Sequence, residues 1–292
     1  MKGVAGSLRE FTVFALNQHL GIQADERFGW ARTGVPDFDE DGVEDEFSVG
    51  QVTAMTIYQA TLPPPRRVPY RDAARARLAS LGESRFEKIG CADCHRTSLP
   101  LRSAWFFEPS PFNRPGSIVP ADVAGQIKVP IPVAKGTGVY ATEEGEVRVA
   151  AFTDLKRHVI CDADDPFYCN ERLRQDFVPT DQFLTSKLWD LGSSAPYGHR
   201  GDLTTLSEAI VHHSGEAKPA KRAFLALPDA EKTALILFLK SMQIDEQAGA
   251  ANNPRRLDAN VLDHDGLRRS PVGQRRGPRA RDGLTPRLRP LP

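Results

Sequence analysis

The pentapeptide Cys91-Ala92-Asp93-Cys94-His95 constrains the fold of this chain more than any other stretch of its sequence. Two thiols three positions apart can reach the two vinyl groups on one edge of a haem, and the next residue can turn its imidazole toward the iron. Only 4 cysteines and 7 histidines occur among 292 residues, so chance is a poor explanation of this order. The motif predicts one covalent haem c, attached at Cys91 and Cys94, with His95 as a ligand of the haem iron.

Three other interpretations of the motif are a zinc site, a redox dithiol and a plain disulfide. Zinc needs two more ligands, which Cys161 and Cys169 could supply, although their spacing of eight residues is loose for a zinc knuckle. A redox dithiol normally lies on the turn between a strand and a helix, and no α/β unit is predicted before Cys91. Cys161 and Cys169 are more simply explained as a local disulfide of an oxidising compartment, with two unpaired thiols as the alternative.

Apolar periodicity and capping residues divide the chain into four parts. Residues 1–63 are predicted to be a helical segment with an acidic loop, in which Ser7 and Ser48 cap two helices. A Pro- and Arg-rich linker follows at 64–76, and the haem domain spans 77–245. The tail, 246–292, is rich in arginine and proline and is predicted to be disordered, because it cannot bury enough apolar surface.

We expect a mainly α fold, namely a cytochrome c-like haem domain preceded by the short helical segment. One helix is predicted to end at Gly90, just before the motif, and an amphipathic helix spans 228–242. These two helices would pack together beside the haem. The residues between His95 and Trp189 are rich in proline and glycine and are expected to form long irregular insertions.

Charge and hydropathy exclude several classes of protein. Lys+Arg and Asp+Glu both number 38, which argues against a nucleic-acid or membrane-surface protein as a whole. No apolar stretch is long enough for a membrane span. The first ten residues do not form a signal peptide, because Arg9 and Glu10 fall where its apolar core should run. We expect either a cytoplasmic protein or a chain that lacks its natural start.

Residues 37–46 hold seven acidic side chains in ten positions. Position 12 of a calcium-binding loop that starts at Asp37 would be Ser48, so the usual bidentate glutamate is absent. Calcium binding and a solvated acidic loop are both open interpretations. Five residues match positions 1, 3, 5, 6 and 9 of such a loop: Asp37, Asp39, Asp41, Gly42 and Asp45.

A sixth ligand of the iron cannot be assigned from the residues alone. Met242 is predicted to lie on the core stripe of the last helix, where a methionine is more often core than ligand. The histidines that remain as candidates are His158, His199, His212 and His213.

The segment 187–217 carries a resemblance to a known family. Its runs Lys187–Gly192, Ala195–Asp202 and His213–Ala217 resemble the C-terminal haem domain of the bacterial di-haem oxidoreductases. These proteins are regarded as peroxidases or thiol oxidoreductases and are related to the bacterial di-haem cytochrome c peroxidases. The resemblance covers roughly residues 8–245, and residues 8–62 resemble the segment between the two haem domains of that family.

The resemblance implies roles for two histidines. His199 corresponds to a histidine that lies close to the haem groups and is needed for their function, so it is the candidate catalytic residue. Fourteen residues later the family places the sixth iron ligand, which is His213 here and not its neighbour His212. His95 and His213 would then form a bis-histidine iron site. The usual His-Asp-Gly-Arg order is changed here to His199-Arg200-Gly201-Asp202.

The chain also departs from the family, because it has one Cys-x-x-Cys-His motif where the family has two. We therefore expect the C-terminal portion of a longer periplasmic protein, serving as its electron-transfer domain. A redox partner protein or the missing haem domain would exchange electrons with it, and whether this chain is itself an enzyme stays open. The alternatives are a stand-alone mono-haem electron carrier without catalytic activity and a zinc- or disulfide-stabilised binding module.

Overall fold

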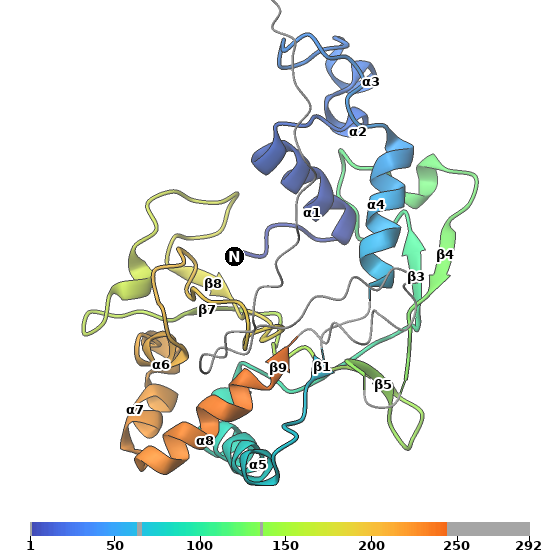
Figure 1. The fold of residues 1–292 in the computed structure, drawn as a ribbon. Helices are drawn as coiled ribbons and strands as arrows, with labels where there is room; N and C mark the ends of the chain where they lie inside the picture. The colour runs from blue at the N-terminus through green and yellow to red at the C-terminus, as the bar shows by residue number, and fades with distance from the viewer. Residues whose placement is uncertain (1, 63–65, 135–136, 244–292) are drawn as a thin grey trace, which may run out of the picture. The chain divides into compact units, whose positions relative to one another are not determined.

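Two helices that are far apart in the sequence pack against each other and carry the Cys91–His95 motif at one end (Figure 1). They are α5 (Ala73–Lys88) and α8 (Asp229–Lys240). The structure is a computed structural model that describes residues 2–62, 66–134 and 137–243, all within one compact unit of the chain. The predicted disordered tail at 246–292 lies outside the described residues.

Helix α5 ends just before Gly90, as the sequence predicts, and begins after Asp72. The side chain of Asp72 accepts a hydrogen bond from the backbone N–H of Arg75 at 2.8 Å and caps the first turn. Gly90 follows the last turn with φ of 89°, a left-handed conformation that glycine adopts without strain. The chain then enters the short 3₁₀-helix η2 (Cys91–Asp93), so the helix end fixes the start of the motif.

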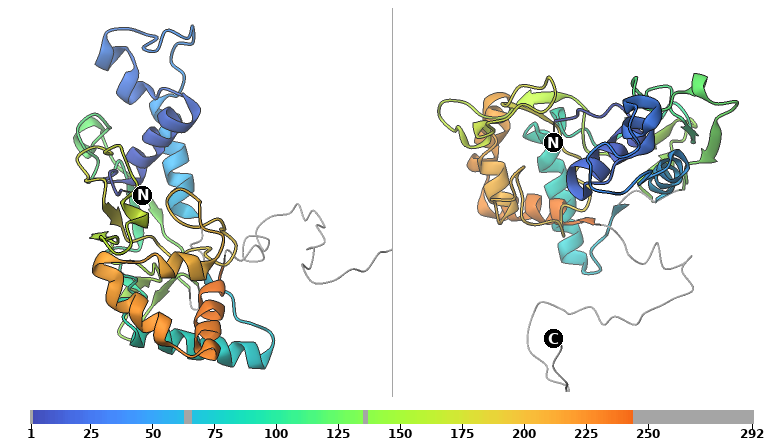
Figure 2. Two further views of the ribbon diagram at one scale, coloured as in Figure 1. Left: turned by 90° about the vertical axis from the view of Figure 1, so that its left-hand side faces the viewer. Right: turned by 90° about the horizontal axis from the view of Figure 1, so that it is seen from above.

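Helices α5 and α8 lie side by side in two further views (Figure 2), and their contact is close because Gly82 lies at their crossing. A Cβ atom on Gly82 would lie 2.0 Å from the backbone oxygen of Ala234. Arg85 and Glu231 add a bidentate ion pair between the helices, with N–O distances of 2.6 and 2.8 Å. Glycine therefore permits a helix approach that no other residue would allow.

The principal apolar core surrounds this crossing. Helices α6 (Leu206–Val211) and α7 (Lys218–Ala226) contribute Leu206 and Phe224 to it. Cys91 and Ala92 of the motif pack against the same core, so the motif is anchored on its apolar side. The remaining buried members are Phe86, Leu188, Leu235, Phe238, Leu239 and Met242.

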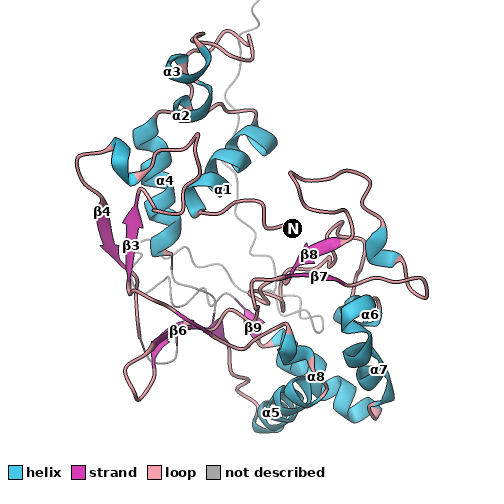
Figure 3. Cartoon of the chain, turned by 180° about the vertical axis from the view of Figure 1, so that it is seen from behind, coloured by secondary structure: helices cyan, strands magenta, loops and turns pink. Residues whose placement is uncertain are grey.

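Short antiparallel strands replace the irregular insertions that the sequence suggests (Figure 3). Among the described residues 38% are helical and 13% lie in strands, so the prediction of a mainly α, cytochrome c-like fold is wrong. The paired strands are β1 (Arg66–Arg67) with β9 (Met242–Gln243), β3 (Trp105–Glu108) with β4 (Ile127–Pro130), and β7 (Arg157–Val159) with β8 (Gln182–Leu184). A further sheet has the order β2 (Leu99–Pro100), β6 (Val147–Val149), β5 (Val139–Ala141).

The physical reason for this error is that these strands are two to four residues long, too short for an alternating pattern to be recognised. Most are stabilised by a partner distant in sequence, as where Trp105 pairs with Pro130, whereas β5 and β6 form a local hairpin. The 3₁₀ turns η3 (Pro120–Asp122) and η4 (Phe167–Cys169) lie between paired strands, whereas η5 (Gly215–Ala217) lies between α6 and α7.

The N-terminal helices begin at the predicted caps. Ser7 accepts a hydrogen bond from Glu10 N–H at 3.2 Å, and Ser48 forms a capping box with Gln51. Among the described helices none is both long and apolar enough to cross a membrane. The elements here are α1 (Leu8–Ala15), the π-helix η1 (Leu16–Leu20), α2 (Asp25–Phe28), α3 (Trp30–Thr33) and α4 (Val49–Thr61).

A buried cluster of charges joins these helices to β3. The Nε atom of Arg9 lies 2.9 Å from both carboxylate oxygens of Glu26, and its Nη1 lies 2.7 Å from Oε1 of Glu108. Arg9 also donates to the hydroxyl of Thr53 on α4 at 2.9 Å. Burial raises the pKa of Glu108, against the opposing effect of Arg9. One arginine thus ties four elements together.

Replacing Gly82 by alanine is expected to destabilise the protein. Overpacking a core costs about 1–3 kcal/mol, which exceeds the ~1 kcal/mol that alanine gains over glycine in a helix. We expect the free energy of unfolding in urea, followed by circular dichroism, to fall by about 1–2 kcal/mol. The matched control is Gly50→Ala in α4, where an added Cβ atom would lie 3.9 Å from Ser48 Oγ, so stability should be unchanged or higher. Equal stability of the two variants would contradict the close crossing.

Candidate functional site

The two motif cysteines are free thiols on the turn that follows α5. The backbone N–H of His95 donates to the carbonyl of Cys91 at 3.0 Å and closes this turn. Burial raises the pKa of Cys91 to about 12 and also raises the pKa of Cys94. Because a redox dithiol requires a thiolate of lowered pKa, these neutral, partly buried thiols do not have the character of one.

The imidazole of His95 is fixed by a backbone carbonyl. Its Nδ1 lies 3.0 Å from the carbonyl oxygen of Phe152. A carbonyl can only accept, so Nδ1 carries the proton in this contact. Burial, followed by the nearby His213, lowers the pKa of His95 to about 4, which keeps the ring neutral. Neutral imidazole with its Nδ1–H bound to a carbonyl is the usual state of a metal-binding histidine.

His213 follows the last turn of α6, and its imidazole contacts a backbone carbonyl in the same way as that of His95. Its Nδ1 is 2.6 Å from the carbonyl oxygen of Ala209, one turn earlier in the helix, so this nitrogen also carries the proton. Burial lowers the pKa of His213. The two rings lie close enough for a charge on His213 to lower the pKa of His95. Both histidines predicted to bind iron are therefore buried and within electrostatic range of each other, while their role as ligands stays a prediction.

His212 has a different environment from its neighbour. Its ring stacks on Phe167 with 4.0 Å between centroids, and its Nδ1 lies 3.3 Å from a carboxylate oxygen of Asp165. Adjacent residues at a helix end point in different directions, and only one of them can face a given partner. His212 therefore faces Phe167 and Asp165, and His213 is the one of the two whose charge affects the pKa of His95.

His199 lies in a second cluster, beside the rings of Phe183 and Tyr168 at centroid distances of 4.7 and 6.0 Å. Its side chain is 10% exposed, and Nε2 lies 3.2 Å from a carboxylate oxygen of Glu171. The angle is not that of a hydrogen bond, so this nitrogen has no hydrogen-bond partner among the described residues. Tyr168 is also 5.8 Å from the ring of His213, so one aromatic side chain separates the two histidines. The proposed catalytic role of His199 is not tested by this arrangement.

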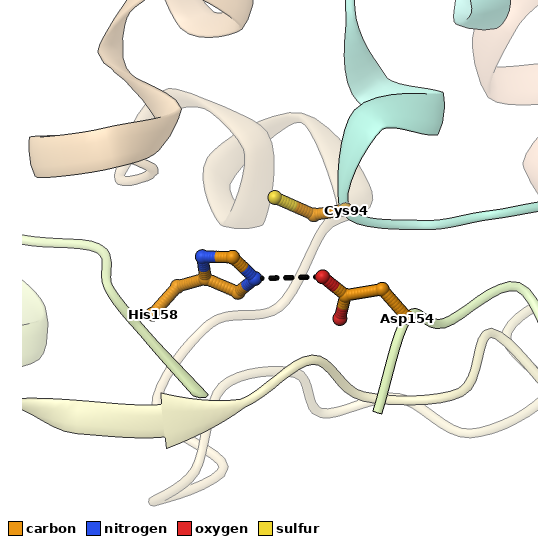
Figure 4. Close-up of side chains that lie close together, drawn as sticks. All are labelled: Cys94, Asp154 and His158. Carbon is orange, nitrogen blue, oxygen red and sulfur yellow. Dashed lines mark hydrogen bonds and ion pairs between the residues drawn. The ribbon is translucent and has the colours of Figure 1, made fainter. Parts of the chain in front are cut away.

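Asp154 and His158 lie beside Cys94; the sequence names His158 as a candidate iron ligand but does not identify Asp154. The sulfur, a carboxylate oxygen and a ring nitrogen lie within 4.8 Å of one another (Figure 4). His158 Nε2 is 2.9 Å from Asp154, and Nδ1 is 2.7 Å from Glu216. Burial lowers the pKa of His158, but the hydrogen bonds to Glu216 and Asp154 outweigh it and raise the pKa overall. The spacing of four residues between Asp154 and His158 could have indicated their contact from the sequence. Glu216 is too distant in the sequence for its contact with His158 to be predicted.

These contacts also weaken two alternatives. Both ring nitrogens of His158 already face carboxylates, so His158 is a poor candidate for the sixth iron ligand. Cys161 and Cys169 form a disulfide, as the simpler interpretation predicts, and a disulfide cannot supply the thiolates of a zinc site.

A cavity of about 460 Å³ lies next to the candidate site, and one of its lining residues is Phe152, whose carbonyl contacts His95. Leu188, Trp189 and Met242 also line it, and Met242 is buried in the core as predicted. The lining found in the described part of the chain does not include the motif cysteines or histidine. The cavity is therefore a neighbour of the candidate site and not the site itself.

The acidic loop brings three of its four predicted ligands together. Carboxylate oxygens of Asp37, Asp39 and Asp41 lie within 4.8 Å of one another, whereas Asp45 is not part of this group. The backbone N–H of Gly42 donates to Asp37 at 2.9 Å. Exposed carboxylates also gather without an ion, so calcium stays a prediction.

Comparison with known proteins bears on the second half of the chain. Residues 142–242 match the family model described as "Di-haem oxidoreductase, putative peroxidase". The matched region includes His158, His199 and His213 but begins after the Cys91–His95 motif. Searches of curated proteins and of solved structures found no match. The family comparison thus confirms, over residues 142–242, the resemblance to the peroxidase-like di-haem oxidoreductases.

Proposed function

We propose that this chain is a c-type haem-binding, electron-transfer domain of a di-haem oxidoreductase-like protein. Cys91 and Cys94 would hold one haem c covalently, and His95 and His213 would be the iron ligands. The matching environments of these two buried histidines are the observation that supports the proposal most. A lowered pKa favours the neutral form of each ring, and each has its Nδ1 within hydrogen-bond distance of a backbone carbonyl, while His95 also contacts the backbone of Ser186.

The residues present fit a covalent haem. The two thiols are free and lie on one short turn, and the turn is anchored by the packing of Cys91 against the helical core. Carbonyls of Phe152 and Ala209 hold the two imidazoles in one tautomer. A haem bound there would supply one-electron redox chemistry, while these side chains would tether it, orient it and limit its contact with water.

The choice of ligands affects the electronic properties of the proposed site. Two imidazoles stabilise ferric iron more than an imidazole and a thioether do, because axial methionine raises the reduction potential. Met242 is 4% exposed and belongs to the core, so it does not compete with His213. Two protein ligands would suit electron transfer better than peroxide binding, for which an open iron position is needed.

The second candidate function is a stand-alone mono-haem electron carrier, favoured by the single Cys-x-x-Cys-His motif. Both candidates need a redox partner, which in the first case is a second haem domain, and both would form in the periplasm, where c-type haem is attached. An in-frame second motif in the genomic sequence upstream of Met1 would favour the first candidate. Its absence would favour the carrier.

Covalent haem attachment is directly testable. The chain, expressed with a periplasmic leader and a c-type maturation system, should keep its haem stain after denaturing electrophoresis. Cys91→Ser with Cys94→Ser should lose the stain, because both thioether bonds are removed. Asp93→Asn, between the two cysteines, is the control and should keep it. An unstained parent chain under these conditions would reject the proposal.

The ligand assignment predicts different effects of two adjacent substitutions. His213→Ala should convert the ferric haem from low to high spin, because one strong-field ligand is lost. His212→Ala should stay low-spin, since that ring stacks on Phe167. The absorption spectrum of the loaded protein measures both, and no thioether–iron band should appear in the red. The reverse pattern would assign the iron to His212, and no change in either would make His158 or His199 the next candidate.

The calcium hypothesis makes its own prediction. Ser48 caps α4 with Gln51, so no bidentate ligand is available and binding should be weak, with a Kd of about 10⁻⁴–10⁻³ M. Isothermal titration should show one Ca²⁺ per chain, lost when Asp37 and Asp39 are replaced by asparagine. Glu44→Gln is the control, because Glu44 is not part of the carboxylate group. No saturable heat in the parent chain would leave the solvated acidic loop as the interpretation.

A further inference from the structure

The loop closed by the disulfide Cys161–Cys169 is held against the segment that carries His213. We call residues 161–169 the disulfide loop and residues 212–221 the ligand segment. Three acidic residues of the loop meet basic side chains of the segment: Lys218 pairs with Asp162 at 3.1 Å and also with Asp164, and Lys221 pairs with Asp165 at 2.6 Å. Partly exposed ion pairs contribute little because water screens them, so other contacts must provide most of the attachment.

Backbone contacts join the two segments next to His213. The N–H of Ser214 donates to the carbonyl of Ile160 at 2.9 Å, and the N–H of Gly215 donates to Asp162 at 3.2 Å. Gly215 has φ of 54°, and a Cβ atom there would lie 2.4 Å from the oxygen of Val159 and 2.8 Å from that of Cys161. The chain on either side of the first disulfide cysteine therefore touches the two residues that follow His213.

Ring contacts extend this attachment to the histidines. Phe167 of the disulfide loop stacks on His212, and Tyr168 makes an edge contact with His213 at 5.8 Å between centroids. Tyr168 is 5% exposed and packs with Cys161 and Phe183 in one apolar cluster. Its ring is fixed on one side by that cluster and adjoins His213 on the other.

We propose that the disulfide loop is a positioning device that holds the ligand segment, so that the Cys161–Cys169 bond strengthens coordination of iron by His213. The proposal rests on the ligand role of His213 given above. Closing this loop of nine residues removes conformations in which Tyr168 and Asp162 leave the ligand segment. Without the bond these contacts open more often, and the open form releases His213.

Binding of an external ligand reports the open fraction. Imidazole can occupy the sixth position only when His213 has left it, so its apparent affinity is its intrinsic affinity multiplied by that fraction. A positioning device that keeps His213 in place must therefore weaken imidazole binding. A purely structural disulfide remote from the ligand would not change this affinity.

The test titrates imidazole into the ferric, haem-loaded full chain and follows the absorption spectrum. Cys161→Ser with Cys169→Ser should bind imidazole about tenfold more tightly than the parent. This is on the order of the increase in the open fraction expected when the disulfide no longer closes a short loop. His213→Ala should bind imidazole more tightly still, and its affinity is the upper limit, reached when no His213 competes for the iron. The control Asp164→Asn changes a loop side chain that is 75% exposed and pairs with Lys218, so the imidazole affinity of this variant should stay within about twofold of the parent's.

A second variant keeps the disulfide intact. Gly215→Ala should push the ligand segment away from Val159 and Cys161, and it should also tighten imidazole binding, even if the double serine variant fails to take up haem. Suppose that His213→Ala binds imidazole more tightly than the parent, but the haem-loaded double serine variant or Gly215→Ala binds it with the parent's affinity. This result would overturn the positioning role and leave the ligand assignment intact. Parental affinity in His213→Ala would instead remove the ligand assignment, and the positioning role with it.

Discussion

The crossing of α5 and α8 is the contact on which the rest of the candidate site depends. Gly82 lets the helices approach at backbone distance, and Phe86 and Phe238 meet in the core at 5.3 Å between centroids. Phe152 packs on both rings, and its carbonyl binds His95. The aromatic packing thus fixes the carbonyl that orients the imidazole. A change in the helix crossing would reach His95 through Phe152 as well as through the end of α5.

The local features of this fold were predictable from sequence because they depend on neighbours along the chain. Ser7 and Ser48 cap helices through groups three residues away, and Gly90 ends α5 through its own backbone conformation. The Cys161–Cys169 bond closes a short loop and was the simpler interpretation of its spacing. Each of these required only a residue type and a short distance in sequence.

The remaining features depend on partners that no local pattern reveals. The carbonyl of Phe152 comes to His95 from fifty-seven residues away, and Glu216 comes to His158 from fifty-eight. The short strands are equally dependent on distant partners, which is why the expected α fold was wrong. The family resemblance supplied what periodicity could not, the preference for His213 over His212, and the structure gives that preference a physical basis in the stacking of His212 on Phe167.

The buried cluster of Arg9, Glu26 and Glu108 has a consequence for how this sequence can vary. Glu26 and Glu108 both pair with Arg9, and all three side chains are about 1% exposed. Loss of one partner from a buried ion pair costs about 3–5 kcal/mol, whereas replacing a whole cluster by apolar residues is often neutral. Replacing any one of the three charged residues alone is therefore strongly disfavoured, although a cluster in which all three are apolar is not. Positions 9, 26 and 108 should drift as one unit through evolution, and relatives should show either all three charges or none.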